Sequence, residues 1–383
     1  MRRVSQEAKK ILSATHFPFW ALSFHVYELT GESRYGGGQF RVLYAGTRPF
    51  LHYFKKTTFA ARPKEAFLGT HNILALDRIR RAGNWDVEIF RGHRLFASLG
   101  FFPSGLFVPE WISGICSLEH HENHEHCSRS RRRDRAQLQK NNLSYAITTR
   151  SRDLNYFYEE MYLDHMQDQH GGAVCLMSRE EMMSRVHNDN GELVMIYRGA
   201  EPVAGSLIYM ENSRPRLFSQ GVLQNDKELL RAGVGTAVYL FSLDHLSQRG
   251  FKEINMGWTR ALLSDGSLYF KQRFGLCVSE ASAIGHFLTW SPTSDVARKY
   301  LENTGFIHCR RGVMRGALFR ASGSDASEDL VNQKLAQCKA IGLHRVNVTD
   351  LRTTDAQSAV CVDRVDDVVS ERLGSAAADR LDR

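Results

Sequence analysis

Glu192–Gly275 reads ELVMIYRGAEPVAGSLIYMENSRPRLFSQGVLQNDKELLRAGVGTAVYLFSLDHLSQRGFKEINMGWTRALLSDGSLYFKQRFG. Its first part contains short apolar segments separated by turn-forming residues: Glu192–Arg198, Pro202–Met210 and Arg216–Val222. Strand-sized apolar segments joined by short turns are typical of an antiparallel meander. We therefore expect three neighbouring strands here.

A helix is predicted next, after the polar loop Gln224–Glu228. Apolar residues recur there at helical spacing, at Leu230, Val234, Ala237 and Phe241, and Gly250 fits just past the end of the helix. Phe251–Met256 then predicts a buried strand, and the run Leu263–Gly275 follows.

The glycines at the start of this helix indicate a phosphate site. Gly233 and Gly235 allow backbone N–H groups to approach a ligand without a Cβ in the way, and a helix N-terminus favours an anion. A pyrophosphate suits such a loop. Two glycines alone are a weak signal, but their place between a meander and a further strand makes the prediction more specific.

The order of these elements resembles the acetyltransferase (GNAT) fold. The ending, Asp265-Gly266, Phe270-Lys271 and Phe274-Gly275, is similar to that of the Fem-like and cellulose-biosynthesis-type N-acyltransferases. The resemblance covers roughly residues 100 to 285 well and the N-terminal third only loosely. The family usually has Gln or Arg at the start of the pyrophosphate loop, where this chain has Leu230, with Arg231 one place along.

The resemblance implies roles for several residues. The strand ending at Val222 is expected to splay, so that the backbone at Val222 and Leu223 binds an acyl group and its pantetheine arm. The pyrophosphate is expected at the loop formed by Arg231, Gly233, Gly235 and Thr236. Lys271 and Phe270 are implied at the reaction centre, where the ammonium suits an oxyanion or a donor phosphate. For Lys271 the alternative is an ordinary surface lysine.

Two further residues are weaker candidates. Asp265 is a candidate general base, although Asp-Gly is also ordinary turn chemistry. Arg260, which follows the predicted strand, is a candidate for substrate binding.

An arginine-rich helix is predicted from Arg129 to about Asn141. Arginine forks pair bidentately with phosphates, and in the similar family this segment lies beside the acceptor cleft. We therefore interpret Arg132 and Arg133 as substrate-binding residues, with a solvated helix between domains as the alternative.

Potential metal ligands precede that helix. The segment from Glu119 to Cys127 holds His120, His121, His124, His126 and Cys127. A structural zinc site needs a second ligand cluster, and the sequence has none at a suitable spacing. We therefore predict no metal and interpret the segment as a solvated polar helix or loop.

The length of 383 residues suits two domains with an appendage. We predict an α/β (α+β) protein of tandem GNAT-like domains, each with a mixed, mostly antiparallel sheet flanked by helices. The predicted ranges are 1–142, 143–320 and a strand–helix–strand extension over 321–383. Within them, Pro63–Leu68 and Asn72–Arg81 are predicted as helices, and Phe40–Tyr44, Val87–Phe90 and Leu95–Leu99 as strands.

The composition of the chain indicates its cellular compartment and the class of its partners. The formal net charge of +8 favours phosphates, CoA, nucleotide-linked sugars, tRNA or an acidic membrane surface. The seven cysteines include no C-x-x-C pair, which favours a reducing compartment. No segment reaches the length of a membrane span. These features predict a cytoplasmic protein without an integral membrane segment.

Together these features predict an N-acyltransferase that moves an acyl or aminoacyl group to an amine. Acyl-CoA is the expected co-substrate, with aminoacyl-tRNA or an acyl carrier protein as other donors. The expected acceptor is a small-molecule, lipid-linked or nucleotide-linked amine, such as a precursor of the cell envelope or a polysaccharide. The alternatives are a non-catalytic scaffold or binding protein in such an assembly and, less favoured, a metal-dependent hydrolase.

Overall fold

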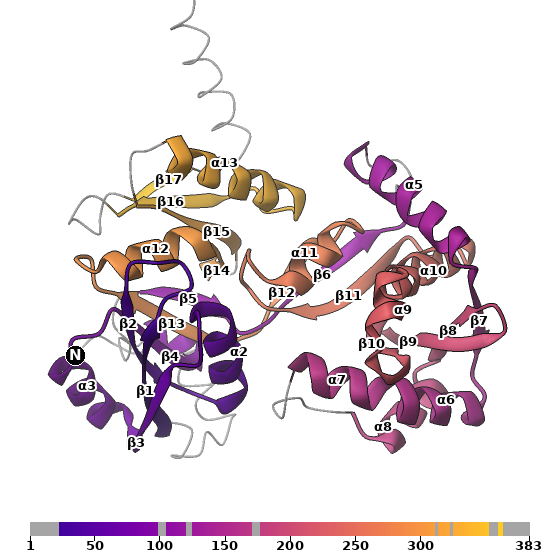
Figure 1. Cartoon of the computed structure of the whole chain (residues 1–383), viewed down its shortest axis with the longest axis horizontal. Helices are drawn as coiled ribbons and strands as arrows, with labels where there is room; N and C mark the ends of the chain where they lie inside the picture. The colour runs from indigo at the N-terminus through magenta and orange to yellow at the C-terminus, as the bar shows by residue number, and fades with distance from the viewer. Residues whose placement is uncertain are drawn as a thin grey trace, which may run out of the picture. The chain divides into compact units, whose positions relative to one another are not determined.

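The structure is a computed structural model and describes residues 23–98, 105–119, 125–170, 177–310, 313–321, 325–351 and 359–362. The chain forms two compact units (Figure 1). Unit 1 comprises Met1–Ile112, Arg260–Leu268 and Glu280–Arg383, and unit 2 comprises Ser113–Thr259 and Tyr269–Ser279.

Unit 1 is built on a six-stranded mixed sheet with the order β3-β1-β2-β4-β13-β5. Its strands are β1 (Ser23–Glu32), β2 (Gln39–Ala45), β3 (Lys64–Asn72), β4 (Val87–His93), β5 (Leu106–Pro109) and β13 (Ile284–Trp290). The pair β2/β4 is parallel, and the other neighbours are antiparallel. Its helices are α2 (Arg48–Thr58), α3 (Ile73–Ala82) and the single turn α4 (Leu95–Ser98).

Strand β13 occupies the interior of this sheet although it is distant in sequence from its neighbours. Phe287 is opposite Phe90 of β4 on one side and Phe107 of β5 on the other. All three rings belong to the same buried cluster, together with Phe24, Val26 and Trp85. The core of unit 1 is therefore completed only by the second half of the chain.

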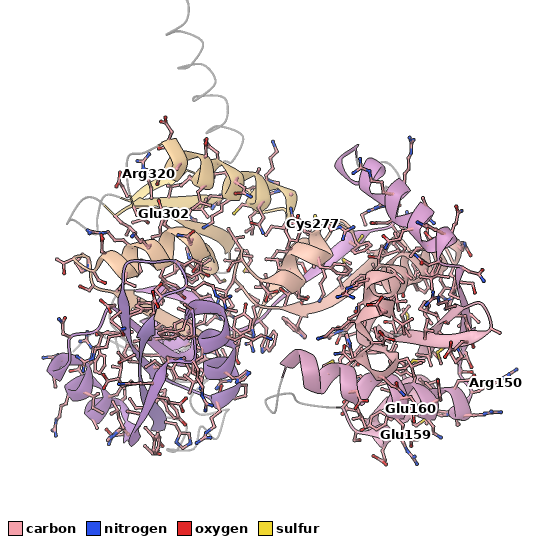
Figure 2. The ribbon with its side chains drawn as sticks, in the orientation of Figure 1. Arg150, Glu159, Glu160, Cys277, Glu302 and Arg320 are labelled. Atoms are coloured by element: carbon pink, nitrogen blue, oxygen red, sulfur yellow. The ribbon has the colours of Figure 1, made fainter. Side chains whose placement is uncertain are left out.

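A smaller sheet, β14-β15-β16-β17, also belongs to unit 1. Its strands are β14 (Phe306–Arg310), β15 (Val313–Arg320), β16 (Val346–Asp350) and β17 (Ala359–Val362), with helices α12 (Asp295–Thr304) and α13 (Asp325–Ala340). Figure 2 labels Glu302 on α12 and Arg320 on β15. Glu302 accepts hydrogen bonds from Ala321 N (3.1 Å) and Ser327 Oγ, and Arg320 pairs with Asp350 (3.0 Å) and Glu328. These contacts hold the helices to the small sheet.

Unit 2 is built on a seven-stranded mixed sheet with the order β12-β6-β11-β10-β9-β8-β7. Its strands are β6 (Ile112–Ser117), β7 (Leu143–Thr148), β8 (Glu192–Arg198), β9 (Glu201–Glu211), β10 (Arg214–Val222), β11 (Glu253–Thr259) and β12 (Cys277–Ala281). Strands β7 to β10 are successive antiparallel neighbours, and β10 and β11 are parallel.

The helices of unit 2 pack on the two faces of its sheet. They are α5 (Glu125–Lys140), α6 (Ser151–Phe157), the π-helix η2 (Tyr158–Tyr162), α7 (Leu163–His170), α8 (Arg179–Asn188), the short helices η4 (Leu223–Asn225) and α9 (Lys227–Arg231), and α10 (Val234–Gln248). Helix α11 (Gly266–Gln272) contains the division between the units. Buried residues of α6, η2 and α8 pack on Leu193, Met195 and Leu207 of the sheet.

Side-chain caps fix the starts of two helices. Ser178 Oγ accepts a hydrogen bond from Glu181 N (3.1 Å) at the start of α8, and Ser294 Oγ accepts from Ala297 N (3.1 Å) at the start of α12. Such caps satisfy donors that the first turn of a helix leaves without partners.

The predicted fold class is confirmed, because two mixed, mostly antiparallel sheets with flanking helices carry the chain. The meander β8–β10 matches its predicted segments closely. The compact units divide the chain at other positions than 142 and 320, because β13 pairs with β4 and β5 of unit 1. No helix in the described ranges is long and apolar enough to cross a membrane.

Two predicted elements are wrong. Pro63–Leu68 is not a helix, because Lys64–Asn72 forms the strand β3 and pairs along β1. Leu95–Leu99 is not a strand, because Leu95–Ser98 forms one helical turn. In both places the neighbouring structure outweighs the weak local preference of a short segment.

Candidate active site

Strands β10 and β11 of unit 2 separate after a single point of pairing. The parallel pair is formed at Arg216 and Asn255, whereas β10 remains paired with β9 as far as Val222. The register between β9 and β10 shifts between Leu217 and Ser219, so Phe218 is an extra, bulged residue. A bulge bends its strand and increases the local twist. Pairing between β10 and β11 therefore ends beyond Arg216, although Leu217, Ser219 and Val222 of β10 remain buried.

Gly257 allows the two strands to approach closely just before they separate. Its φ is +72°, and a Cβ there would lie 2.9 Å from the Leu217 carbonyl oxygen. Its N–H donates to the side-chain oxygen of Asn255 (2.8 Å). A side chain would clash and would strain the backbone, so only glycine fits this position without a shift.

Lys271 lies at the same point. Helix α11 places its side chain in a buried position, 6% exposed. Its Nζ donates a hydrogen bond to the Trp258 carbonyl oxygen (2.9 Å) and lies 3.9 Å from the position of a Cβ on Gly257. The ammonium is thus held beside the place where β11 leaves β10, and Lys271 is not an exposed surface lysine.

Phe270 anchors α11 to α10. Its ring contacts the rings of Tyr239 and Phe274, each with centroids 5.2 Å apart, and Tyr239 stacks on Phe274 at 4.9 Å. Burial raises the pKa of Tyr239 to about 12, although a hydrogen bond with Gln220 of β10 opposes the shift. The cluster fixes the helix that carries Lys271.

The predicted glycine loop precedes α10. Gly233 is buried, adopts a left-handed φ of +96° and is the residue before the first turn of α10. A Cβ on Gly235 would meet only Leu230, at 3.8 Å, and Thr236 is half-buried. The first N–H groups of a helix have no partners within the helix, so this turn presents donors suited to an anion.

Helix α5 holds this loop through side-chain amides. Gln137 Nε2 donates to the Arg231 carbonyl (2.9 Å), and Asn141 Nδ2 donates to the Ala232 carbonyl (3.0 Å). Both carbonyl groups therefore point toward α5.

The same helix is tied to both neighbouring helices. Arg135 forms a bidentate pair with Asp244 of α10 (2.7 and 2.8 Å). Arg273, two residues after Lys271, donates through Nη2 to both carboxylate oxygens of Asp134 (2.8 and 2.9 Å). Helix α5 thus links the glycine loop to the lysine.

The arginines predicted to bind substrate lie on the exposed side of α5. Arg132 and Arg133 are exposed, whereas Arg131 is buried and its guanidinium approaches Gly275. The exposed side chain of Arg231 pairs with Glu228 on α9. Glu228 thus offsets the charge of Arg231, whereas Arg132 and Arg133 add positive charge to the exposed side of α5.

Val222 ends β10, and Leu223 begins the short helix η4. Val222 is buried, and the next residues, Gln224 and Asn225, both have φ of +49°. The side chain of Asn225 bonds to His165 of α7 (2.8 Å). Left-handed backbone in residues other than glycine is costly and clusters at functional sites.

Two predicted site residues lie in unit 1. Arg260 is buried over the Trp111 ring (3.7 Å) and pairs with Glu110 (3.6 Å), and burial lowers its pKa. Asp265 accepts hydrogen bonds from Tyr53 Oη (3.0 Å) and from Leu268 N (2.9 Å), so it caps α11. Burial, together with Asp265, raises the pKa of Tyr53.

Other residues at the site were missed from sequence. Arg216, Phe218 and Trp258 surround the separation of the strands, and Asn255 positions Gly257. The available signal was Gly257-Trp258 directly after a buried strand, since a glycine there indicates close backbone approach.

The potential metal ligands fall largely outside the described residues. His120–His124 are among the residues that the structure does not describe, and only the backbone of Glu125–Cys127 is assigned, to α5. In the described part of the chain, no group of three or more His, Cys, Asp or Glu side chains could hold a metal.

Several known structures are similar to parts of this chain. The C-terminal DUF2156 domain of an Agrobacterium fabrum protein named as a lysylphosphatidylglycerol synthetase is similar over 71% of this chain and 82% of its own, with 12% identity and a TM-score of 0.34. FemX is similar over 76% and 97%, with 10% identity and a TM-score of 0.33. An aminoglycoside acetyltransferase from an uncultured soil metagenomic sample is similar over 30% and 76%, with 16% identity and a TM-score of 0.24.

No protein-family model and no curated protein matches the sequence. An acetyltransferase and FemX are thus among the known structures to which this chain is similar.

Proposed function

We propose that unit 2 is an N-acyltransferase that moves an acyl or aminoacyl group from an activated donor to an amine. One observation carries the proposal. The parallel strands β10 and β11 separate beyond Arg216 and Asn255, the buried ammonium of Lys271 lies at the separation, and the glycine loop follows β10.

The donor is acyl-CoA or a related activated acyl compound. The pantetheine arm lies along the open edge of β10, where Val222 and Leu223 offer backbone hydrogen bonds. Its pyrophosphate lies at Gly233, Gly235 and Thr236, with Arg231 nearby. The donors in the first turn of α10 and the positive charge of the chain suit that group. An aminoacyl-tRNA or an acyl carrier protein presents the same acyl carbonyl.

The reaction needs a positioned carbonyl and stabilisation of the charge that develops on its oxygen. The amine nitrogen attacks the acyl carbon, the C–N bond forms, and the bond to the donor sulfur or oxygen breaks. The departing thiol or hydroxyl takes up the proton that the amine loses. The ammonium of Lys271 supplies positive charge where the oxyanion forms. Arg132 and Arg133 remain candidates for binding acceptor phosphates at the exposed face of α5.

Isothermal titration with acetyl-CoA, longer acyl-CoAs and charged tRNA tests the donor site. Binding of one of them, followed by its turnover with an amine, is the expected result. If none binds, the protein is not a transferase of this kind. Binding without turnover, and unchanged cellular function in Lys271→Met, would favour the alternative, a non-catalytic scaffold in envelope or polysaccharide assembly.

A further inference from the structure

An arginine and two exposed aromatic rings form an unassigned surface beside Lys271. We infer that this surface, formed by Arg216, Phe218 and Trp258, binds the ring of the acceptor amine. The inference rests on the proposed function, because it concerns the second substrate of the same site.

The face of the sheet on which Arg216 lies can be established by alternation along the strands. Glu192 contacts His245 of α10 (2.7 Å), whereas its neighbour Leu193 packs under α6 and α8. Leu193 is opposite Leu207, and successive residues alternate between faces. Tyr209, two residues after Leu207, therefore lies on the α8 face, and the Arg185 guanidinium of α8 lies 4.9 Å above its ring.

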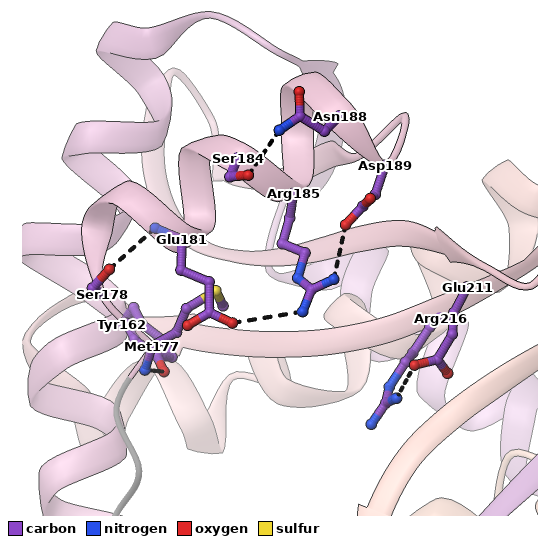
Figure 3. Close-up of polar contacts among 10 residues, drawn as sticks. All are labelled: Tyr162, Met177, Ser178, Glu181, Ser184, Arg185, Asn188, Asp189, Glu211 and Arg216. Carbon is purple, nitrogen blue, oxygen red and sulfur yellow. Dashed lines mark hydrogen bonds and ion pairs between the residues drawn. The ribbon is translucent and has the colours of Figure 1, made fainter.

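Arg216 is opposite Tyr209, so it lies on the same face and away from α10. Figure 3 shows Arg216 paired with Glu211, apart from the group in which Arg185 pairs with Glu181 and Asp189. The glycine loop begins α10, on the other face. If the donor binds at the glycine loop, the face of the sheet that carries Arg216 is available to the acceptor.

The two rings flank the arginine and remain in contact with solvent. The guanidinium carbon of Arg216 lies 5.5 Å from the Phe218 ring and 5.7 Å from the Trp258 ring. Phe218 is 37% exposed because the bulge turns it outward, and Trp258 is 40% exposed. The carbonyl of Trp258 is the group that holds Lys271 Nζ. The backbone of Trp258 therefore connects this surface to the candidate reaction centre.

The arginine offers a polar contact at the same place. Its Nη1 donates to Glu211 Oε1 (2.6 Å), while its Nε is buried and has no hydrogen-bond partner among the described residues. An arginine has five N–H donors, and Glu211 accepts from one of those of Arg216, so the guanidinium keeps donors for a ligand oxygen. Glu211 offsets its charge, so the surface suits a neutral ring edge better than a phosphate.

The chemistry points to an amine carried on a six-membered ring. The apolar ring face lies on Trp258 and Phe218, and an oxygen at the ring edge accepts from the guanidinium of Arg216. A sugar ring and a hydroxylated aromatic ring share this chemistry, since both combine an apolar face with a polar edge.

Steady-state kinetics with a fixed donor and three amines tests this inference. Glucosamine and tyramine carry rings, and cadaverine is an open-chain control. We expect Trp258→Ala and Phe218→Ala each to raise the acceptor KM for one ring amine about tenfold, with little change for cadaverine or for the donor KM. Whichever ring amine responds identifies the ring class. Arg216→Lys keeps the charge but loses the planar fork, and it should raise the same KM.

The matched control is Tyr156→Ala, which removes a similarly exposed ring (36%) from α6 of the same unit. Its kinetics should equal those of the unaltered protein. Equal effects on cadaverine and the ring amines, or no effect on any, would overturn the inference.

A binding experiment separates this inference from the proposed function. Each ring amine is added stepwise to the unaltered protein and to Trp258→Phe, and the tryptophan fluorescence of both is recorded. The difference between the two signals reports on Trp258. A difference signal that saturates with a ring amine supports the ring surface even where no donor binds. Donor turnover without any such signal would overturn the ring surface and leave the transferase intact.

Discussion

The side-chain ammonium of Lys271 and the backbone carbonyl of Trp258 are joined by a 2.9 Å hydrogen bond. The bond ties α11 to the end of β11, next to the glycine that allows β10 and β11 to approach. It therefore places a buried positive charge at a point set by backbone geometry.

Replacing Lys271 by Met should abolish most of the acyl transfer while leaving donor binding largely intact. Removing one group that stabilises an oxyanion lowers kcat by about 10²–10³-fold. The measurement is kcat alongside donor affinity by titration. Lys140→Met, an exposed lysine at the end of α5, serves as the control and should behave like the unaltered protein. Full activity in Lys271→Met would remove the lysine from the mechanism.

Gly233→Ala should weaken donor binding about tenfold and also lower the free energy of unfolding. A residue with a Cβ at a φ of +96° costs about 1–2 kcal/mol, and here the methyl group would also press on Gln137, at 3.3 Å. Gly250→Ala is a matched control, because its φ is +80° and nothing lies within 4 Å of the added Cβ. Gly250→Ala should lower the free energy of unfolding by a similar amount, while its donor affinity should equal that of the unaltered protein. Equal donor affinity in both variants would place the anion elsewhere.

The amide contacts from α5 should tune donor affinity. Gln137→Ala and Asn141→Ala each remove one hydrogen bond to the loop carbonyls, and each should raise the donor Kd by about 2- to 10-fold. Gln139→Ala changes an exposed amide on the same helix and provides the baseline. Loop orientation is independent of α5 if all three variants bind the donor alike.

The stability of unit 1 should fall as the solution becomes acidic, through His286. This side chain is 3% exposed and stacks on Phe50 at 3.6 Å, and both ring nitrogens lack partners among the described residues. Burial lowers its pKa well below 6.5, and Arg91 and Arg260 add to the shift. Below pH 6.5 the unfolded chain therefore binds a proton that the folded chain does not.

The free energy of unfolding should then drop by about 1.4 kcal/mol for each pH unit below that point, until the folded histidine also titrates. Urea denaturation between pH 5 and pH 8 measures the slope. His286→Leu should flatten it, and His344→Leu, at an exposed position, should not. An unchanged slope in His286→Leu would show that other groups control the acid response.

The sequence was informative where local chemistry and tertiary packing agree. The strands β8, β9 and β10 followed from apolar segments and the turns between them. Gly233 and Lys271 could be proposed as site residues because a glycine before a helix and the motif around the lysine are recognisable from neighbouring residues alone.

Other features depend on residues that are distant in the sequence, so the neighbouring residues do not indicate them. The strand β3 forms because it pairs with β1. Arg260 is buried because it contacts Glu110 and the Trp111 ring. The ring surface at Phe218 depends on a bulge, which is defined only by the register between two strands. Arg132 and Arg133 could not be separated from the buried Arg131 without knowing which side of α5 packs.

The position of β13 has a consequence for how the chain matures. During synthesis, β4 emerges long before Ile284–Trp290, its interior neighbour in the finished sheet. Unit 2 is encoded almost wholly between them, so it can fold first. Until β13 is made, the edge of β4 that will pair with it has no partner strand. A nascent chain halted shortly before residue 284 should therefore depend on chaperones more than the completed protein does.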